Sequence, residues 1–473
     1  MRDSKLISVL KTMTKKEFRD FGRFVYSPFF NRLNNILKFF EELKKYYPDF
    51  ANKEFTAENL YSKMFPDEPY SYSKMKLLES DMLKLAEEYL AFIGYKENSF
   101  ETDKFLLTEL KKRKLNKLFE INYKRANKDL ENITYKDENY FFAKFYFENQ
   151  NILNITNNKL YYEKDIIQKQ LNYFIDYFLL QILRLYSFMT YQQKYLFGFD
   201  FDLRFLDEVT GYITRYPDAI KPLILLQYYD VMLSITGEEN YYVKLKEMTE
   251  QYYRIIDINE LYNIYVSLAK FMREKFDENS NKYIDEIFEL YKTILGKGIF
   301  KSHFHMSNTF FINTADLALR KKDHLFLQDF INEYSGRLPL EHTADTLNYC
   351  NALKSFYEKN YESALGHLAL VETLDISYKL IIKSLTLRIY YELNSIDSAE
   401  SLIDTYRHLL LNNKLVTESL KNENLNFINY FSQLFRIKNE FNHENAEFLK
   451  KQISERKDIA LKYWLIEKID EMI

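Results

Sequence analysis

One pattern occurs twice near the carboxyl end of the chain and limits the folds that the chain can adopt. Residues 356–364 and 390–399 each contain an aromatic helix end, a short polar turn, an apolar residue and then alanine. The two alanines, Ala364 and Ala399, lie 35 residues apart. A period of about 34 residues is typical of helix pairs that cannot bury their apolar faces alone and therefore stack on their neighbours. The pattern predicts stacked helical hairpins, with alanine where two helices cross closely.

These two copies resemble tetratricopeptide repeats over residues 344–411. Ala364 and Ala399 match the alanine of that family's second helix. The copies depart from the family in two ways: they lack its first-helix tryptophan, and Leu353 and Leu387 stand where glycine is usual. The resemblance implies a tetratricopeptide-like solenoid whose concave face binds a peptide or a helix of another protein.

Glycine and proline are scarce in the chain, with nine glycines and seven prolines among 473 residues. So few breakers leave little room for the tight turns of a sheet protein and favour long helices with short links. We therefore expect an all-α fold, an α-α superhelix preceded by an N-terminal helical domain. The 41 tyrosines and 40 phenylalanines are expected to fill helix interfaces.

The order of predicted helices and turns divides the chain into four segments. These are an N-terminal helical domain (1–100), a basic linker helix (101–136), degenerate helical-hairpin repeats (137–413) and C-terminal capping helices (414–473). Apolar residues that follow predicted turns are spaced by 42, 42, 36 and 35 residues: Tyr241, Tyr283, Leu325, Tyr361 and Ile396. Whether residues 137–330 are true repeats is left open, because only this spacing supports it. Trp464 is expected to close the last interface.

The N-terminal segment contains a capping box from Thr14 to Glu17 and a helix stop at Ser27-Pro28. Together with Phe21 and Phe24, this segment resembles the opening of an uncharacterised bacterial protein family. Residues 390–413 are similar to that family's late repeat. The resemblance implies a bacterial cytoplasmic protein and carries no activity with it.

Charge and cysteine content point to no special environment. The formal net charge is −3, so no overall field favours nucleic acid or a membrane as partner. A single cysteine, Cys350, excludes an intramolecular disulfide framework and suits a reducing compartment. No apolar run is long enough for a signal peptide or a membrane span. We expect a cytoplasmic protein that has no contact with membranes.

The leading functional hypothesis is a non-enzymatic protein-protein interaction scaffold. In a tetratricopeptide-like frame the first helix of each pair lines the concave face, and cations on it suit an acidic ligand or a terminal carboxylate. The residues expected to contact the partner lie on two first helices: Asn351, Lys354, Tyr357, Ser384, Arg388 and Tyr391.

The alternative is a nucleic-acid-binding protein that uses a basic helix over residues 111–128. Clustered cations can hold phosphates, although neighbouring acidic residues dilute the field. The candidate residues are Lys111, Lys112, Arg113, Lys114, Lys117, Lys124 and Arg125.

Chemistry for catalysis is not visible in the sequence. The one close glycine pair, Gly296 and Gly298, lacks the rest of either nucleotide-binding fingerprint. On a helix, His303 and His305 would point in divergent directions and could not share a metal. We expect no enzyme activity, no cofactor and no metal.

Overall fold

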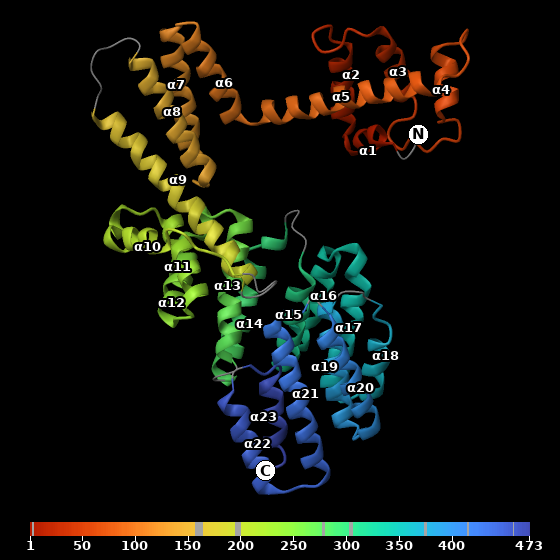
Figure 1. Ribbon diagram of the computed structural model, residues 1–473, viewed down its shortest axis with the longest axis vertical. Coiled ribbons are helices and arrows are strands. Elements are labelled where there is room, and N and C mark those ends of the chain that lie inside the picture. Colours follow the sequence, from red (N-terminus) through yellow and green to blue (C-terminus); the bar gives the residue numbers. More distant parts are fainter. Residues whose placement is uncertain are drawn as a thin grey trace. The chain divides into compact units, whose positions relative to one another are not determined.

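The computed structural model describes residues 1, 4–156, 164–193, 200–276, 280–301, 306–372, 376–413, 416–456 and 458–473 (Figure 1). Every regular element in these ranges is a helix, and the predicted all-α fold class is confirmed. Among these residues, no helix is both long enough and apolar enough to cross a bilayer.

The chain divides into two compact units. Unit 1 comprises residues 1–132 and 143–170, and unit 2 comprises residues 133–142 and 171–473. The four segments expected from the sequence are a finer division and stay a prediction. Helices α8 (Glu138–Thr156) and α9 (Lys164–Tyr191) contribute residues to both units.

Unit 1 begins with a helical core that the sequence predicted closely. Thr14 and Glu17 form the expected capping box at the start of α2, and α2 ends at Tyr26, before Pro28. Aromatic rings fill the helix interfaces: Phe18 and Tyr47, for example, stack with ring centroids 4.0 Å apart. The helices that lie wholly in unit 1 are α1 (Lys5–Thr12), α2 (Lys15–Tyr26), α3 (Asn34–Lys44), α4 (Ala57–Met64), α5 (Tyr72–Glu97), α6 (Ser99–Lys112) and α7 (Asn116–Glu131).

The segment 101–136 does not form one linker helix. It contains most of α6 and all of α7, which pack against each other. Between them Lys114 adopts a positive φ of 56°, a left-handed conformation that breaks the helix. This turn is not evident from the sequence, because its left-handed position is occupied by lysine rather than by the glycine or asparagine that such a conformation favours.

Most helices of unit 2 pack against a neighbour in sequence. The pairs α11–α12, α13–α14, α17–α18 and α19–α20 pack together, and α15 and α17 also contact each other. Ala364 and Ala399 are fully buried, as expected where helices cross closely. The helices are α10 (Leu206–Arg215), α11 (Pro222–Thr236), α12 (Glu239–Tyr252), α13 (Ile258–Phe276), α14 (Ser280–Gly296), α15 (Asn308–Arg320), α16 (His324–Tyr334), α17 (Thr343–Tyr357), α18 (Tyr361–Leu368), α19 (Ile376–Glu392), α20 (Ile396–Asn412), α21 (Glu418–Asn439), α22 (His443–Glu455) and α23 (Lys462–Asp470).

Helix α23 covers the end of this succession. Its Trp464 is 1% exposed, and its ring stacks on Phe431 of α21 with centroids 6.0 Å apart. Tyr391 of α19 meets the same indole edge-on at 5.3 Å. Trp464 therefore lies buried in the last helix interface, where the sequence predicted it.

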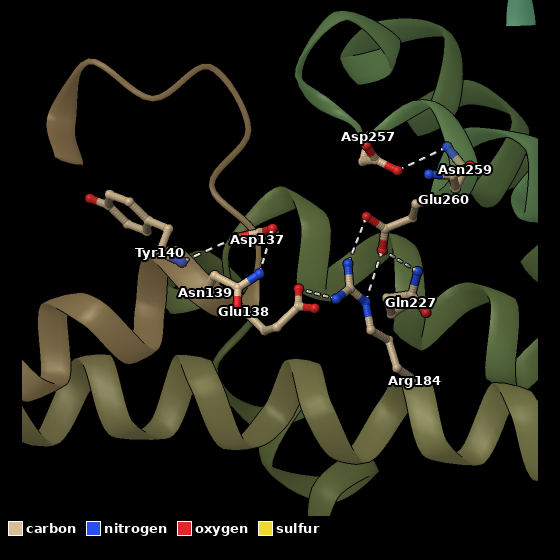
Figure 2. A network of polar contacts seen from close by, with 9 residues as sticks. All are labelled: Asp137, Glu138, Asn139, Tyr140, Arg184, Gln227, Asp257, Asn259 and Glu260. Carbon is tan, nitrogen blue, oxygen red and sulfur yellow. Dashed lines mark hydrogen bonds and ion pairs between the residues drawn. The ribbon is translucent and has the colours of Figure 1, made fainter. Parts of the chain in front are cut away.

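A network of ion pairs joins α9 to the start of α8 and to α13 (Figure 2). The Arg184 guanidinium donates to both carboxylate oxygens of Glu260, with Nη2 2.9 Å and Nε 3.3 Å away, and it also pairs with Glu138. Gln227 of α11 donates to Glu260 at 2.7 Å. Burial raises the pKa of Glu260, and the charge of Arg184 offsets part of that rise.

Replacement of Arg184 tests how much unit 2 depends on this network. Arg184→Met leaves the buried Glu260 carboxylate unpaired, so we expect the free energy of unfolding to fall by about 3 kcal/mol. Adding Glu260→Met removes the stranded charge and should restore at least half of that loss. Urea denaturation of both variants measures the two values; a double variant no more stable than the single one would contradict this account.

A second buried carboxyl in unit 2 makes stability depend on pH. Asp176 of α9 is 7% exposed, and burial raises its pKa from 3.8 to about 6. The folded protein therefore holds this proton more tightly than the unfolded chain does. It follows that stability falls as pH rises from about 4 to about 6, and stays lower above that range.

Asp176→Asn removes this ionisation. We expect the substitution to raise the free energy of unfolding by about 2 kcal/mol more at pH 7.5 than at pH 4.5. Thermal or urea unfolding of parent and variant at both pH values measures the difference. An equal effect at the two pH values would show that the Asp176 carboxyl has an ordinary pKa.

Candidate partner-binding surface

The predicted contact residues lie on α17 and α19, two helices of unit 2 that contact each other. Asn351 and Lys354 of α17 are exposed to solvent. The Lys354 side chain is 52% exposed, and among the described residues it forms one loose ion pair, with Glu358 at 3.9 Å. Such exposed pairs contribute little to stability, so the Lys354 ammonium is available to an external carboxylate.

Tyr357, the third residue on α17, is engaged inside the protein. Its hydroxyl donates to Asp316 at 3.0 Å and accepts from Arg320 Nε at 3.2 Å. Arg320 and Asp316 form an ion pair at 2.8 Å, and the Arg320 guanidinium lies over the Tyr463 ring of α23 at 4.0 Å. Tyr357 therefore ties α17 to α15 and is not free to meet a partner in this conformation.

Ser384 and Tyr391 of α19 are also enclosed. The Ser384 hydroxyl lies 2.9 Å from that of Tyr406, and Tyr391 packs between Trp464 and Phe435. Both are buried. The tetratricopeptide-like frame predicted that this face of α19 is open to a partner. In the structure, α21 and α23 cover Tyr391 on this face.

Arg388 is the unusual member of the set. It is 5% exposed, and its guanidinium carbon lies 4.4 Å from the Phe356 ring centroid and 5.7 Å from that of Trp464. Its Nε is buried and makes no hydrogen bond, and no described carboxylate forms an ion pair with this side chain. Contact with ring faces stabilises a cation only in part, so the charge of Arg388 favours a nearby anion.

The sequence did not reveal the group formed by Asp316, Arg320, Tyr357 and Tyr463. These residues come from α15, α17 and α23, and Tyr463 is 143 residues from Arg320. The one visible signal was the i, i+4 spacing of Asp316 and Arg320, which suits an ion pair on a helix.

The basic candidates of α6 and α7 are mostly paired within unit 1. Glu109 forms ion pairs with both Lys112 and Arg113, and the neighbouring Lys111 donates to Gln150 at 2.6 Å. Arg125 pairs with Asp103 and Asp129.

The described residues offer no ion pair to the three remaining cations, Lys114, Lys117 and Lys124. Exposed Leu118 and Ile121 lie on the same helix as two of them. Neutralised charges and interspersed apolar side chains weaken a phosphate-binding face, and nucleic-acid binding stays a prediction.

The part of the chain that the structure describes contains no set of three or more His, Cys, Asp or Glu side chains able to hold a metal ion. Cys350 is buried, and burial raises the pKa of its thiol, which disfavours the reactive thiolate. His303 and His305 lie outside the described residues.

One pocket of about 590 Å³ lies in unit 1, between Phe55, Tyr70 and Tyr72. Its buried carboxylate, Glu79, pairs with Lys76 of the same pocket at 2.8 Å. This ion pair offsets the charge of Glu79, and Glu58 and Met1 also line the pocket.

Substitution of Arg388 tests whether its positive charge stabilises the fold or serves to bind a partner. Arg388→Met keeps the length of the side chain and removes a buried charge that has no ionic partner. We expect its free energy of unfolding to stay within about 1 kcal/mol of the parent value. Arg388→Glu should lower the free energy of unfolding by about 3 kcal/mol, because a buried carboxylate would face two electron-rich rings. Urea denaturation distinguishes the two, and a large loss in Arg388→Met would mark a purely structural cation.

No family model matches this sequence, and no curated protein and no solved structure matches it either. The tetratricopeptide-like resemblance and the resemblance to a bacterial family therefore stay predictions, and functional inference rests on the residues themselves.

Proposed function

We propose that this protein is a non-enzymatic scaffold that binds an acidic group of a partner protein, carried by a peptide or a helix, around Arg388, Lys354 and Asn351. The observation that carries the proposal is the buried guanidinium of Arg388, which lacks an anionic partner among the described residues. Most buried charges in proteins are paired, and an unpaired one is most simply explained by a ligand that supplies the missing charge.

Two further features support this function over catalysis. The helix pairs of unit 2 provide rigid, closely packed neighbours from which α17 presents Asn351 and Lys354 to solvent. Lys354 is a second cation, exposed on α17, and α17 contacts the helix that carries Arg388. A cytoplasmic location is part of the same proposal and follows from the composition alone.

Recovery of partner proteins from the native cell tests the proposal. We expect Lys354→Glu and Arg388→Met each to reduce recovery of the bound partner about tenfold, because each removes a charge that attracts the acidic group. Lys451→Glu is the matched control, since Lys451 is 75% exposed on α22 and, like Lys354, pairs loosely with a glutamate four residues later. Circular dichroism must show that all three variants fold. Unchanged recovery with both test variants would remove this surface from consideration.

A further inference from the structure

Helix α9 carries an exposed apolar row along its part in unit 2. Five of its residues are 41 to 62% exposed: Leu171 (49%), Phe174 (46%), Phe178 (41%), Leu185 (57%) and Phe188 (62%). With Gln181 between them, the row advances by alternating steps of three and four residues. That spacing is the one by which two helices pack in a coiled coil.

The opposite side of α9 already supplies what unit 2 needs from this helix. Leu179, Leu180, Leu183 and Tyr186 are buried. A helix at the surface of a protein normally has a polar outer face, and a helix that is apolar all round is covered on all sides. The five apolar residues of the row remain 41 to 62% exposed, and an exposed apolar row of this length marks an interaction surface.

No charged side chain belongs to the exposed row. Between residues 171 and 191 the only charged residues are Asp176, which is buried, and Arg184, which pairs with Glu138 and Glu260. The row therefore offers no charge that would select a partner of opposite sign, and no like charges that would repel an identical helix.

We propose that this row is the interface of a homodimer in which α9 packs antiparallel against α9 of a second copy. In an antiparallel pair related by a twofold axis, each row residue meets a row residue of the other helix. Leu171 lies opposite Phe188, Phe174 opposite Leu185, and Phe178 opposite Gln181. The residue numbers of every pair sum to 359. Every residue of the row therefore has a partner when the row is aligned with a second copy running in the opposite direction.

The side chains of these layers favour the same pairing. Both outer layers combine one leucine with one phenylalanine, so large and small side chains alternate across the interface, as close packing requires. The central layers place Gln181 beside Phe178. The twofold axis passes between the two central layers, so the Gln181 amides of the two copies are neighbours, and a shifted register would separate them.

The area of this interface suits a moderate affinity. The row extends along about 25 Å of helix, and pairing two rows buries on the order of 1,000 Å². This buried area lies near the lower limit for a specific dimer. We therefore expect a dissociation constant on the order of 1 µM.

Sedimentation velocity of the full chain between about 1 and 100 µM tests the dimer. We expect the parent to dimerise over this range and Leu185→Glu to stay monomeric, because the charge would be buried opposite Phe174. Leu411→Glu is the matched control: Leu411 is 60% exposed on α20, away from the row, and should leave dimerisation unchanged. A monomeric parent, or a parent dimer that Leu185→Glu leaves intact, would overturn the proposal.

Cysteine cross-linking tests the direction of the helices. The double variant Leu171→Cys/Phe188→Cys places thiols opposite each other in both outer layers, and a short bismaleimide should link it into dimers. Single Leu171→Cys should not link, because residue 171 of the second copy lies at the other end of the interface. Cross-linking of the single variant would indicate a parallel pair and refute the antiparallel one. The parent serves as a control, since its only thiol, Cys350, is buried.

Discussion

Contacts between the apolar faces of neighbouring helices form the core at the carboxyl end of unit 2. Ala364 and Ala399 are fully buried because adjacent helices approach closely there. The same packing continues to the last helices, where Trp464 covers Tyr391 and Phe431. Polar contacts also join helices from distant parts of the chain, as Arg184 does with Glu138 and Glu260.

Local signals in the sequence predicted the secondary structure well. The capping box at Thr14, the stop before Pro28 and the alanines of the two copies all depend on residues close in sequence, and each is present. The turn at Lys114 could not be predicted, because lysine rarely adopts a positive φ. The burial of Arg388 by Phe356 and Trp464 could not be predicted either, since Trp464 comes from a helix much later in the chain.

The predicted contact surface shows that equivalent positions in two sequence repeats can have different surroundings in the folded protein. The frame assigned one role to equivalent positions on α17 and α19, but these helices have different neighbours. Lys354 faces solvent, whereas α23 encloses Arg388 at the equivalent position. An isolated cation in such an enclosure is weakly solvated, and this makes it a stronger attractor for an anion than the exposed Lys354.

The contact between Tyr391 and Trp464 also has a consequence for biosynthesis. These residues are 73 positions apart, and α19 leaves the ribosome well before α23 is made. At usual translation speeds the delay is roughly 4 to 15 s. During that interval the edge of Tyr391 that meets the indole stays open, while Phe431 and Phe435 of α21, which are made earlier, can already pack against the same ring.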